Sequence, residues 1–197
     1  MFPSEIETDR LRLVRLRRET VPARELYRWM GHDALDVEEI SEYTIWSPHQ
    51  TMKETHEHLV EVEEQWEERA QATYAIYPRS GEDGAGEFAG SANLNVGWEK
   101  RTGGLGIWLR KPFWGRGYSG ERAAALMGLA FEDLDLELVA ASHQDGNERS
   151  KRAVTKYVEA HGGQYDGILR NWIPKGDDVR DLHRYTVSWD QYRESRE

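Results

Sequence analysis

The chain has 197 residues and a mass of 22.9 kDa, and its 38% of hydrophobic residues suffice for one domain with a substantial core. It contains no cysteine, which excludes disulfides, thiolate metal sites and a cysteine nucleophile. The 36 Asp and Glu residues outnumber the 26 Lys and Arg residues, giving a formal net charge of −10. This balance argues against a general nucleic-acid-binding protein, because phosphate contacts need a basic surface.

The N-terminal segment, residues 1–7, has neither a basic start nor an apolar core, and the longest apolar run, 123–131, is too short to cross a membrane. We therefore expect a cytoplasmic protein without a membrane partner. Most cations are arginine, and lysine occupies six positions only: 53, 100, 111, 151, 156 and 175. Such a bias among many carboxylates is typical of salt-adapted proteins, and an acidic mesophilic enzyme is an alternative that is nearly as good.

The first predicted elements are a strand and a helix. Residues 10–13 alternate polar and apolar, which predicts a half-buried strand with Leu11 and Leu13 towards the core. Residues 20–32 have helical periodicity, with Leu26, Trp29 and Met30 on one face. Either Thr20 or Pro22 is a suitable start for this helix.

The segment 34–50 has no clean period and is expected to be a loop or a broken helix. It contains Tyr43 and Trp46, whose rings either fill the core or line a substrate cleft. The following Thr51 and Glu54 have the spacing of a capping box, so a helix should begin there. Its apolar stripe would contain Leu59, Val62 and Trp66.

Three histidines, 49, 56 and 58, lie close together in this part of the sequence. A metal site is not expected, because His56 and His58 are two residues apart on a helix and point in different directions.

The next elements are predicted to be strands. Residues 73–77 form one strand, which Pro78 ends, and a mobile loop rich in Gly, Asp and Glu continues to residue 86. Residues 88–98 alternate, with Ala92, Leu94, Val96 and Trp98 on one side, and 99–103 turn the chain into a central strand at 104–110. An antiparallel hairpin is implied.

A glycine-punctuated turn follows the central strand and leads directly into a helix at 119–134. Gly115, Gly117 and Gly120 allow backbone conformations closed to other residues, and the first free N–H groups of the helix carry the positive end of its dipole. Four cations lie around this turn, namely Arg110, Lys111, Arg116 and Arg122. The combination predicts a binding site for a phosphate or pyrophosphate.

The last part of the chain completes a strand–helix–strand unit and a hairpin. The apolar segment 138–141 should be a strand parallel to the central one. Asn147 or Asp145 caps a helix that ends near residue 161, before two glycines. The strands 164–173 and 182–189 flank a turn, with Tyr185, Val187 and Trp189 expected on one face.

The sequence around the turn resembles the GNAT acetyltransferase superfamily, and more narrowly the RimJ/RimL-type ribosomal-protein N-acetyltransferases. The resemblance is carried by Trp-Leu-x-x-Pro-Phe-Trp-Gly-Arg-Gly-Tyr at 108–118, Asn-Glu-Arg-Ser at 147–150, Thr-Asp-Arg-Leu-Arg-Leu at 8–13, Trp-Ser-Pro-His at 46–49, Gly-Ile-Leu-Arg-Asn at 167–171 and Tyr-Thr-Val-Ser at 185–188. It therefore covers nearly the whole chain. It implies a single α/β domain over residues 1–197, in which a mixed, bent β-sheet is flanked by helices.

The resemblance also implies roles for individual residues. Acetyl-CoA, without a metal, would be the co-substrate, held by the backbone of Leu109 and Lys111, by Asn147, and by the turn of Gly115, Arg116, Gly117, Tyr118, Ser119 and Gly120. Ser150 matches the position of a proton donor to the leaving thiolate, and Tyr157 is the second candidate for this role. The usual tyrosine position of the family holds Val154, because the helix is about one turn longer here. Tyr43 and Trp46 would line the substrate cleft, while Trp108 and Phe113 would belong to the core. Two of the proposed site residues have a structural alternative: Asn147 could equally be a helix cap, and Ser150 could only satisfy backbone groups.

The residues leave the general base open. Relatives often carry Glu at the start of the central strand, where this sequence has Gly104, so Glu99, His143 or a water relay remain conceivable. If the acceptor is a protein α-amino group, its pKa near 8 leaves enough neutral amine that no strong base is required.

The sequence thus predicts an N-acetyltransferase that works by direct attack in a ternary complex, in which the amine acceptor is a protein N-terminus or a small molecule such as a polyamine, amino acid or aminoglycoside. A catalytically silent acetyl-CoA-binding module is the alternative. No nucleic-acid partner is expected, and the protein should be a monomer or a homodimer.

Overall fold

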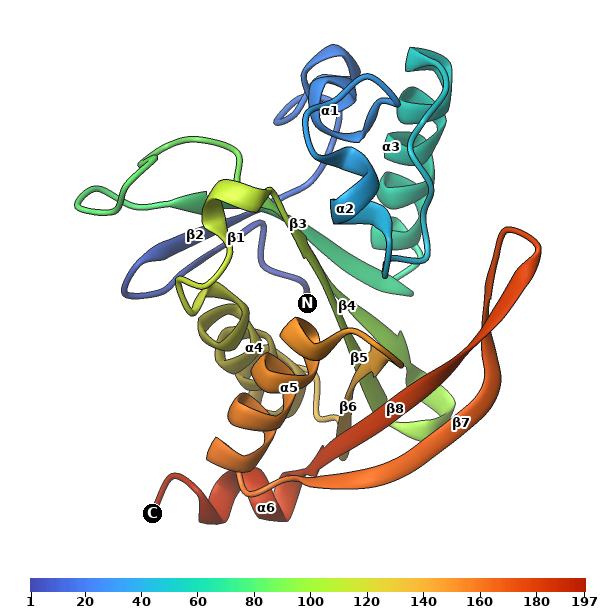
Figure 1. Cartoon of the computed structure of the whole chain (residues 1–197). Coiled ribbons are helices and arrows are strands. Elements are labelled where there is room, and N and C mark those ends of the chain that lie inside the picture. The colour runs from blue at the N-terminus through green and yellow to red at the C-terminus, as the bar shows by residue number, and fades with distance from the viewer. The chain divides into compact units, whose positions relative to one another are not determined.

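An eight-stranded sheet with the strand order β1-β2-β3-β4-β5-β6-β8-β7 forms the framework of the computed structural model, which describes all 197 residues (Figure 1). The strands are β1 (Glu5–Glu7), β2 (Leu11–Arg15), β3 (Gln71–Pro78), β4 (Gly90–Gly97), β5 (Thr102–Leu109), β6 (Leu138–Gln144), β7 (Gln164–Lys175) and β8 (Asp178–Ser188). The helices are α1 (Ala23–Met30), α2 (Val37–Ser41), α3 (Met52–Glu67), α4 (Tyr118–Gly128), α5 (Glu148–Ala160) and α6 (Trp189–Glu194), with 3-10 turns η1 (Trp98–Lys100) and η2 (Lys111–Phe113) and a π-helical segment η3 (Leu129–Asp133). The mixed α/β class predicted from the sequence is confirmed. No helix of the structure is both long and apolar enough to cross a membrane.

The chain divides into two compact units that share the two central strands. The first unit consists of residues Met1–Asn93 and Ile107–Tyr118, and the second of Leu94–Gly106 and Ser119–Glu197. The division passes through β4 and β5, so each unit contains part of both strands.

In the first unit, periodicity and capping place the elements as predicted. Leu11 and Leu13 of β2 are fully buried, and β2 pairs antiparallel with both β1 and β3. Helix α3 begins after Thr51, whose hydroxyl accepts a hydrogen bond from the Glu54 N–H at 3.3 Å. The Glu54 carboxylate reaches back one residue beyond the cap, to the N–H of Gln50 at 2.8 Å.

The core of this unit joins α1 and α3 to the sheet. The cluster consists of Leu16, Val21, Leu26, Met30, Leu59, Val62, Ala75 and Phe88. Trp29, Trp46, Tyr77 and Trp108 pack against it from partly buried positions. The predicted apolar faces of both helices are therefore confirmed, and Phe113 is also buried, as predicted.

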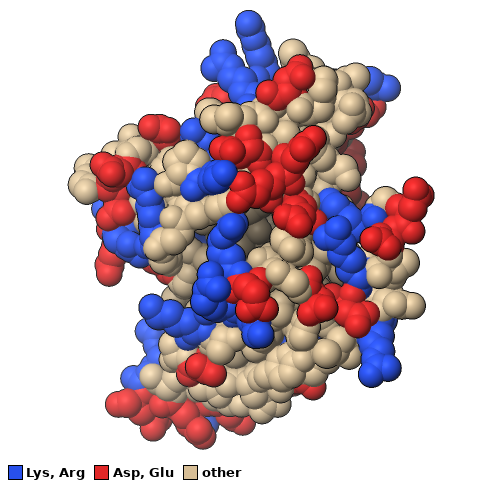
Figure 2. Space-filling view, in the orientation of Figure 1, with Lys and Arg blue, Asp and Glu red and all other residues tan.

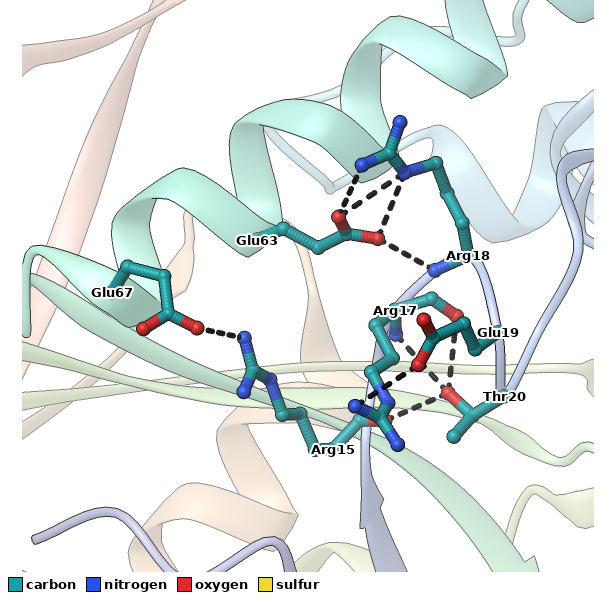
Figure 3. Close-up of polar contacts among 7 residues, drawn as sticks. All are labelled: Arg15, Arg17, Arg18, Glu19, Thr20, Glu63 and Glu67. Carbon is teal, nitrogen blue, oxygen red and sulfur yellow. Dashed lines mark hydrogen bonds and ion pairs between the residues drawn. The ribbon is translucent and has the colours of Figure 1, made fainter.

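Ion pairs connect the exposed face of α3 to the end of β2 and to the segment that follows it (Figure 3). The Nε and Nη2 atoms of Arg18 donate to the Glu63 carboxylate at 3.0 and 2.6 Å. The backbone N–H of Arg18 donates to the same carboxylate at 2.7 Å. Arg15 pairs with Glu67 at 2.6 Å. These exposed pairs orient the helix, and each contributes little to stability.

In the second unit, β5 and β6 are parallel, as predicted for a strand–helix–strand connection. They pair over Thr102–Gly104 and Leu138–Ala140 only, whereas β6 continues its antiparallel pairing with β8 as far as Gln144. Strands β7 and β8 form the predicted hairpin, whose turn is shorter than expected because the strands extend to Lys175 and Asp178. Helix α5 packs on β6, β7 and β8, and it neighbours α4, since a Cβ built at Gly120 would lie 3.8 Å from the Tyr157 Cβ.

Two predictions about tryptophans are wrong. Strand β4 ends at Gly97, and Trp98 begins the η1 turn with 40% of its surface exposed. Trp189 does not share a strand face with Tyr185 and Val187, because it is the first residue of α6 and is 37% exposed. The cause at Trp189 is local, because Ser188 and Gln191 form a reciprocal capping box that ends β8 and starts α6.

Candidate functional site

The glycine-rich turn, residues 115–120, joins η2 to the start of α4. Gly115 and Gly117 have φ values of 76° and 82°, in the left-handed region that favours glycine. Outside the helix's own ladder, none of the N–H groups from residue 115 to residue 120 donates a hydrogen bond to the protein backbone. A series of backbone donors thus leads into a helix N-terminus, an arrangement suited to binding a phosphate group.

Two arginines hold the first part of this turn. The Arg10 guanidinium donates to the carbonyl of Arg116 at 2.8 Å and lies 5.3 Å from the centre of the Tyr118 ring. Arg116 donates to the Asp83 carbonyl at 2.7 Å, and the Tyr118 hydroxyl donates to Glu82 at 2.7 Å. Arg10 lies 106 residues from Arg116 in the sequence, so its contribution to the turn was not foreseen.

The predicted ring of four cations around the turn is only partly present. Arg110 lies 3.5 Å from the centre of the Trp29 ring and donates to the Phe88 carbonyl at 2.6 Å, while Lys111 contacts Glu39 at 2.6 Å and Asp36 at 3.2 Å. Arg110 and Lys111 therefore interact with neighbouring elements of the protein. Arg122 is buried, with 1% of its surface exposed, and does not face solvent at all.

The central strand loses its parallel partner halfway along. Beyond Gly104 and Ala140 no residue pair joins β5 to β6, so backbone groups of Leu105 and Gly106 have no strand neighbour on that side. Further along the strand, the Leu109 carbonyl accepts a hydrogen bond from the Trp114 indole at 2.8 Å. A free strand edge can pair with an extended, amide-bearing ligand.

Asn147 and Ser150 lie at the N-terminus of α5. The Asn147 side-chain oxygen accepts from the Ser150 N–H at 3.0 Å, which identifies Asn147, rather than Asp145, as the cap. The Asn147 amide nitrogen can still donate to a ligand. The Ser150 side chain is half-buried, and its hydroxyl is not needed for capping.

Tyr157 lies about two turns after Ser150 in α5, and only 5% of its surface is exposed. The Arg122 guanidinium lies 5.9 Å from the centre of the Tyr157 ring. Burial raises the pKa of Tyr157, and the neighbouring Arg122 opposes this effect. The Tyr157 ring thus lies beside a buried cation.

Tyr43 and Trp46 are both half-buried in the segment after α2. The Trp46 ring meets Trp108 edge-on at 5.5 Å and His49 at 6.4 Å, as part of an aromatic cluster against the core. This packing accounts for the partial burial of Trp46. A role for either ring in a substrate cleft stays a prediction.

The histidines near α3 form no metal-binding group of three or more ligands. His49 and His58 meet edge-on at 5.8 Å, and a His49 ring nitrogen lies 2.8 Å from the buried Thr55 hydroxyl. His56 is exposed on another face of the helix.

The positions considered for a general base differ in their surroundings. Glu99 is exposed in η1, and a Cβ built at Gly104 would meet only Asn95, at 3.7 Å, so a side chain would fit there. His143 is buried, stacks on His183 at 4.5 Å, and contacts the Tyr185 hydroxyl at 3.3 Å. Burial lowers the pKa of His143.

His183 links this stack to two further side chains on the same side of the sheet. Its ring nitrogens lie 2.9 Å from the Tyr165 hydroxyl and 3.3 Å from Asp145. No local pattern in the sequence indicates this cluster, because it joins residues of β6, β7 and β8.

Known structures share this fold. An acetyltransferase structure from T. thermophilus is 28% identical, with a TM-score of 0.75 over 99% of this chain and 94% of that one. RimL, the ribosomal L7/L12 alpha-N-protein acetyltransferase, is 17% identical, with a TM-score of 0.77 over 93% of each chain. Spermidine N-acetyltransferase from Vibrio cholerae, solved with CoA and spermine, is 14% identical, with a TM-score of 0.73 over 94% of this chain and 99% of that one.

Among curated proteins, no sequence matches. The family model described as "Acetyltransferase (GNAT) domain" matches residues 10–157, a range that includes the glycine-rich turn, Asn147 and Ser150. Because this match spans most of the chain, the protein belongs to the GNAT acetyltransferase domain family.

Proposed function

We propose that this protein transfers an acetyl group from acetyl-CoA to a primary amine, by direct attack in a ternary complex. The observation that carries the proposal is the glycine-rich turn, whose backbone donors lead into the N-terminus of α4 within a GNAT domain. Such an array matches the charge and size of the CoA pyrophosphate. The unpaired edge of β5 beyond Gly104 suits the amides of the pantetheine arm.

The proposed binding residues follow from these surroundings. Gly115, Arg116, Gly117, Tyr118, Ser119 and Gly120 would bind the pyrophosphate, and the backbone of Leu109 and Lys111 would bind the pantetheine arm. The amide nitrogen of Asn147 would donate to the same arm while its oxygen caps α5.

In the reaction, the neutral amine nitrogen attacks the thioester carbonyl carbon, a C–N bond forms, and the C–S bond then breaks. A backbone N–H of β5 would polarise the carbonyl oxygen, a contribution of about 3 kcal/mol if it resembles other oxyanion donors. The amine loses one proton and the departing thiolate gains one. Since an ordinary thiol has a pKa near 8.5, a hydrogen bond from the Ser150 hydroxyl is sufficient assistance. Tyr157 is the second candidate for this hydrogen bond. It is a weaker candidate than Ser150, because it is buried and contacts Arg122.

For the acceptor, we propose a protein N-terminal α-amine. RimL, with a similar fold, carries such an activity in its name, and the net charge of −10 suits a cationic partner such as a ribosomal protein. The same charge also suits a polyamine, the acceptor named for the V. cholerae structure. A third possibility is a catalytically silent acetyl-CoA-binding module, which is favoured by Gly104, because the resemblance to the family implies a Glu at this position.

Thiol release with a panel of amines and N-terminal peptides tests the proposal, together with calorimetry of CoA binding. Release of thiol with an N-terminal peptide supports the first acceptor, and release with spermidine alone supports the second. Binding of CoA without turnover of any amine would point to the silent module. A protein that binds no CoA would overturn the proposal.

A further inference from the structure

Arg122 is the largest fully buried side chain of the protein, with 1% of its surface exposed. Its Nε and Nη1 atoms are buried without a hydrogen-bond partner. Its guanidinium lies 5.9 Å from the centre of the Tyr157 ring, and it forms no ion pair with a carboxylate. A guanidinium is thus enclosed in the protein without a negative charge to balance it.

Such burial opposes folding of the free protein. An ionised group that leaves water needs a partner of opposite charge or a full set of hydrogen bonds, and Arg122 has neither. Its place in the fold adds to the cost, because it directly follows the first turn of α4, where the helix dipole is already positive. In the free protein, only the contact with Tyr157 offsets this charge.

The same place in the fold is favourable for an anion. Side chains of a helix tilt towards its N-terminus, so Arg122 extends back along the turn that contains Ser119 and Gly120. Tyr157 defines the position from the other side: a Cβ built at Gly120 would lie 3.8 Å from the Tyr157 Cβ, and the Arg122 guanidinium lies over the ring of that tyrosine. Gly120 in the first turn of α4 and the Arg122 guanidinium thus both neighbour Tyr157.

We infer that Arg122, held by Tyr157, is a buried positioning residue that strengthens binding of a diphosphate at the N-terminus of α4 without touching it. The inference rests on the proposed function, in which that diphosphate belongs to CoA. Arg122 adds a full positive charge, in a medium of low dielectric constant, to the partial charges of the N–H groups. Binding of the anion then balances the charge that the free protein leaves uncompensated.

Removing the charge of Arg122 should therefore weaken CoA binding without lowering the stability of the free protein. Arg122→Met keeps most of the side-chain length and removes the charge, so the free protein should become as stable as the wild type or more stable. The same variant should bind CoA at least tenfold more weakly, which corresponds to about 1.4 kcal/mol. Pantetheine, which lacks the phosphates, should bind the wild type and the variant equally.

Two further variants sharpen the test. Arg122→Lys retains a positive charge and should keep CoA affinity within about threefold of the wild type, a difference of less than 1 kcal/mol. Arg193→Met removes an arginine charge from the exposed face of α6 and should change neither stability nor CoA affinity. It therefore controls for the change in net charge.

The test measures the affinity for CoA, pantetheine and inorganic pyrophosphate by calorimetry, and the stability of each free variant by thermal unfolding. Weaker CoA and pyrophosphate binding by Arg122→Met, with unchanged pantetheine binding and no loss of stability, supports the inference. Unchanged CoA affinity overturns it, and so does a free variant that is less stable or too unstable to purify, since either result means that Arg122 is an ordinary structural residue. If the wild type binds no CoA, the proposed function itself fails, and the two failures are thereby distinguished.

Discussion

Gly117 illustrates what a single residue contributes to the glycine-rich turn. Its φ of 82° is strained for any other residue, and a Cβ there would lie 3.3 Å from the Arg10 guanidinium. We expect Gly117→Val to weaken CoA binding at least tenfold, or about 1.4 kcal/mol, because the turn changes conformation and the new side chain enters the pyrophosphate site. Calorimetry on the folded variant measures this. Gly81→Val is the matched control, since Gly81 also has a positive φ, of 100°, but belongs to the loop between β3 and β4. Equal affinities of the Gly117 and Gly81 variants would disprove the assignment of the turn.

Ser150 can be tested apart from helix capping, because Asn147 performs the capping. We expect Ser150→Ala to lower kcat with little change in the KM for acetyl-CoA, since the hydrogen bond to the thiolate develops mainly in the transition state. Stability should stay within about 0.5 kcal/mol of the wild type. Asn147→Ala should instead cost about 1 kcal/mol of stability through the lost cap. If Ser150→Ala keeps its kcat and loses affinity, the hydroxyl only binds.

Among the helices, α3 carries a group that makes stability depend on pH. Burial, with a smaller effect of the neighbouring His49, lowers the pKa of His58 to about 4. An unfolded histidine has a pKa near 6.5, so on acidification the unfolded chain takes up the proton first, and stability falls as the pH drops from about 6.5 towards 4. The loss should reach about 2 kcal/mol by pH 5.

Denaturant unfolding between pH 7 and pH 5 measures this dependence. His58→Gln should flatten the curve, while His56→Gln, which changes an exposed residue of the same helix, should leave it as in the wild type. Burial also lowers the pKa of His49, so a smaller slope of the same sign should persist. Identical slopes for the wild type and both variants would exclude His58 as the source.

The elements show which parts of the fold were predictable. Thr51 and Glu54 lie within one turn of each other and sufficed to place the start of α3, whereas the sequence left Asn147 and Asp145 as alternative caps for α5. The α6 cap of Ser188 and Gln191 is equally local, and it turns Trp189 into the first residue of a helix.

The candidate site was predictable only where its residues are neighbours in sequence. The glycine-rich turn met this condition. Contacts such as Arg10 with Arg116, or Arg122 with Tyr157, join distant segments, and charge counting around the turn cannot tell a solvated arginine from a buried one. The burial of Arg122 depends on packing that no local pattern expresses.

At the scale of the whole molecule, the charge balance predicts a response to salt. Acidic and basic side chains are interspersed on the face that Figure 2 shows, and exposed pairs such as Arg101 with Asp135 are numerous. The formal net charge is nevertheless −10. Repulsion should therefore exceed local pairing at low ionic strength, where the screening length is about 30 Å at 0.01 M, against about 3 Å at 1 M.

We expect the melting temperature to rise between 0.01 and 1 M NaCl. Thermal unfolding in NaCl is the suitable measurement, because sulfate also strengthens apolar burial and can occupy an anion site. A melting temperature that stays constant or falls would mean that local pairing already balances the acidic surface. The interpretation as a salt-adapted protein would then be lost.

The irregular pairing of β7 has a consequence for solubility. This strand lies at one end of the sheet and exposes Ile168 and Trp172, the kind of edge on which chains aggregate by adding strands. Its register with β8 shifts between Tyr165 and Gly167 and again between Leu169 and Ile173, Asn171 has a φ of 51°, and Pro174 offers no N–H donor. A second copy therefore finds no long, straight run of backbone groups to pair with, and the edge can expose apolar side chains without promoting the growth of intermolecular sheets.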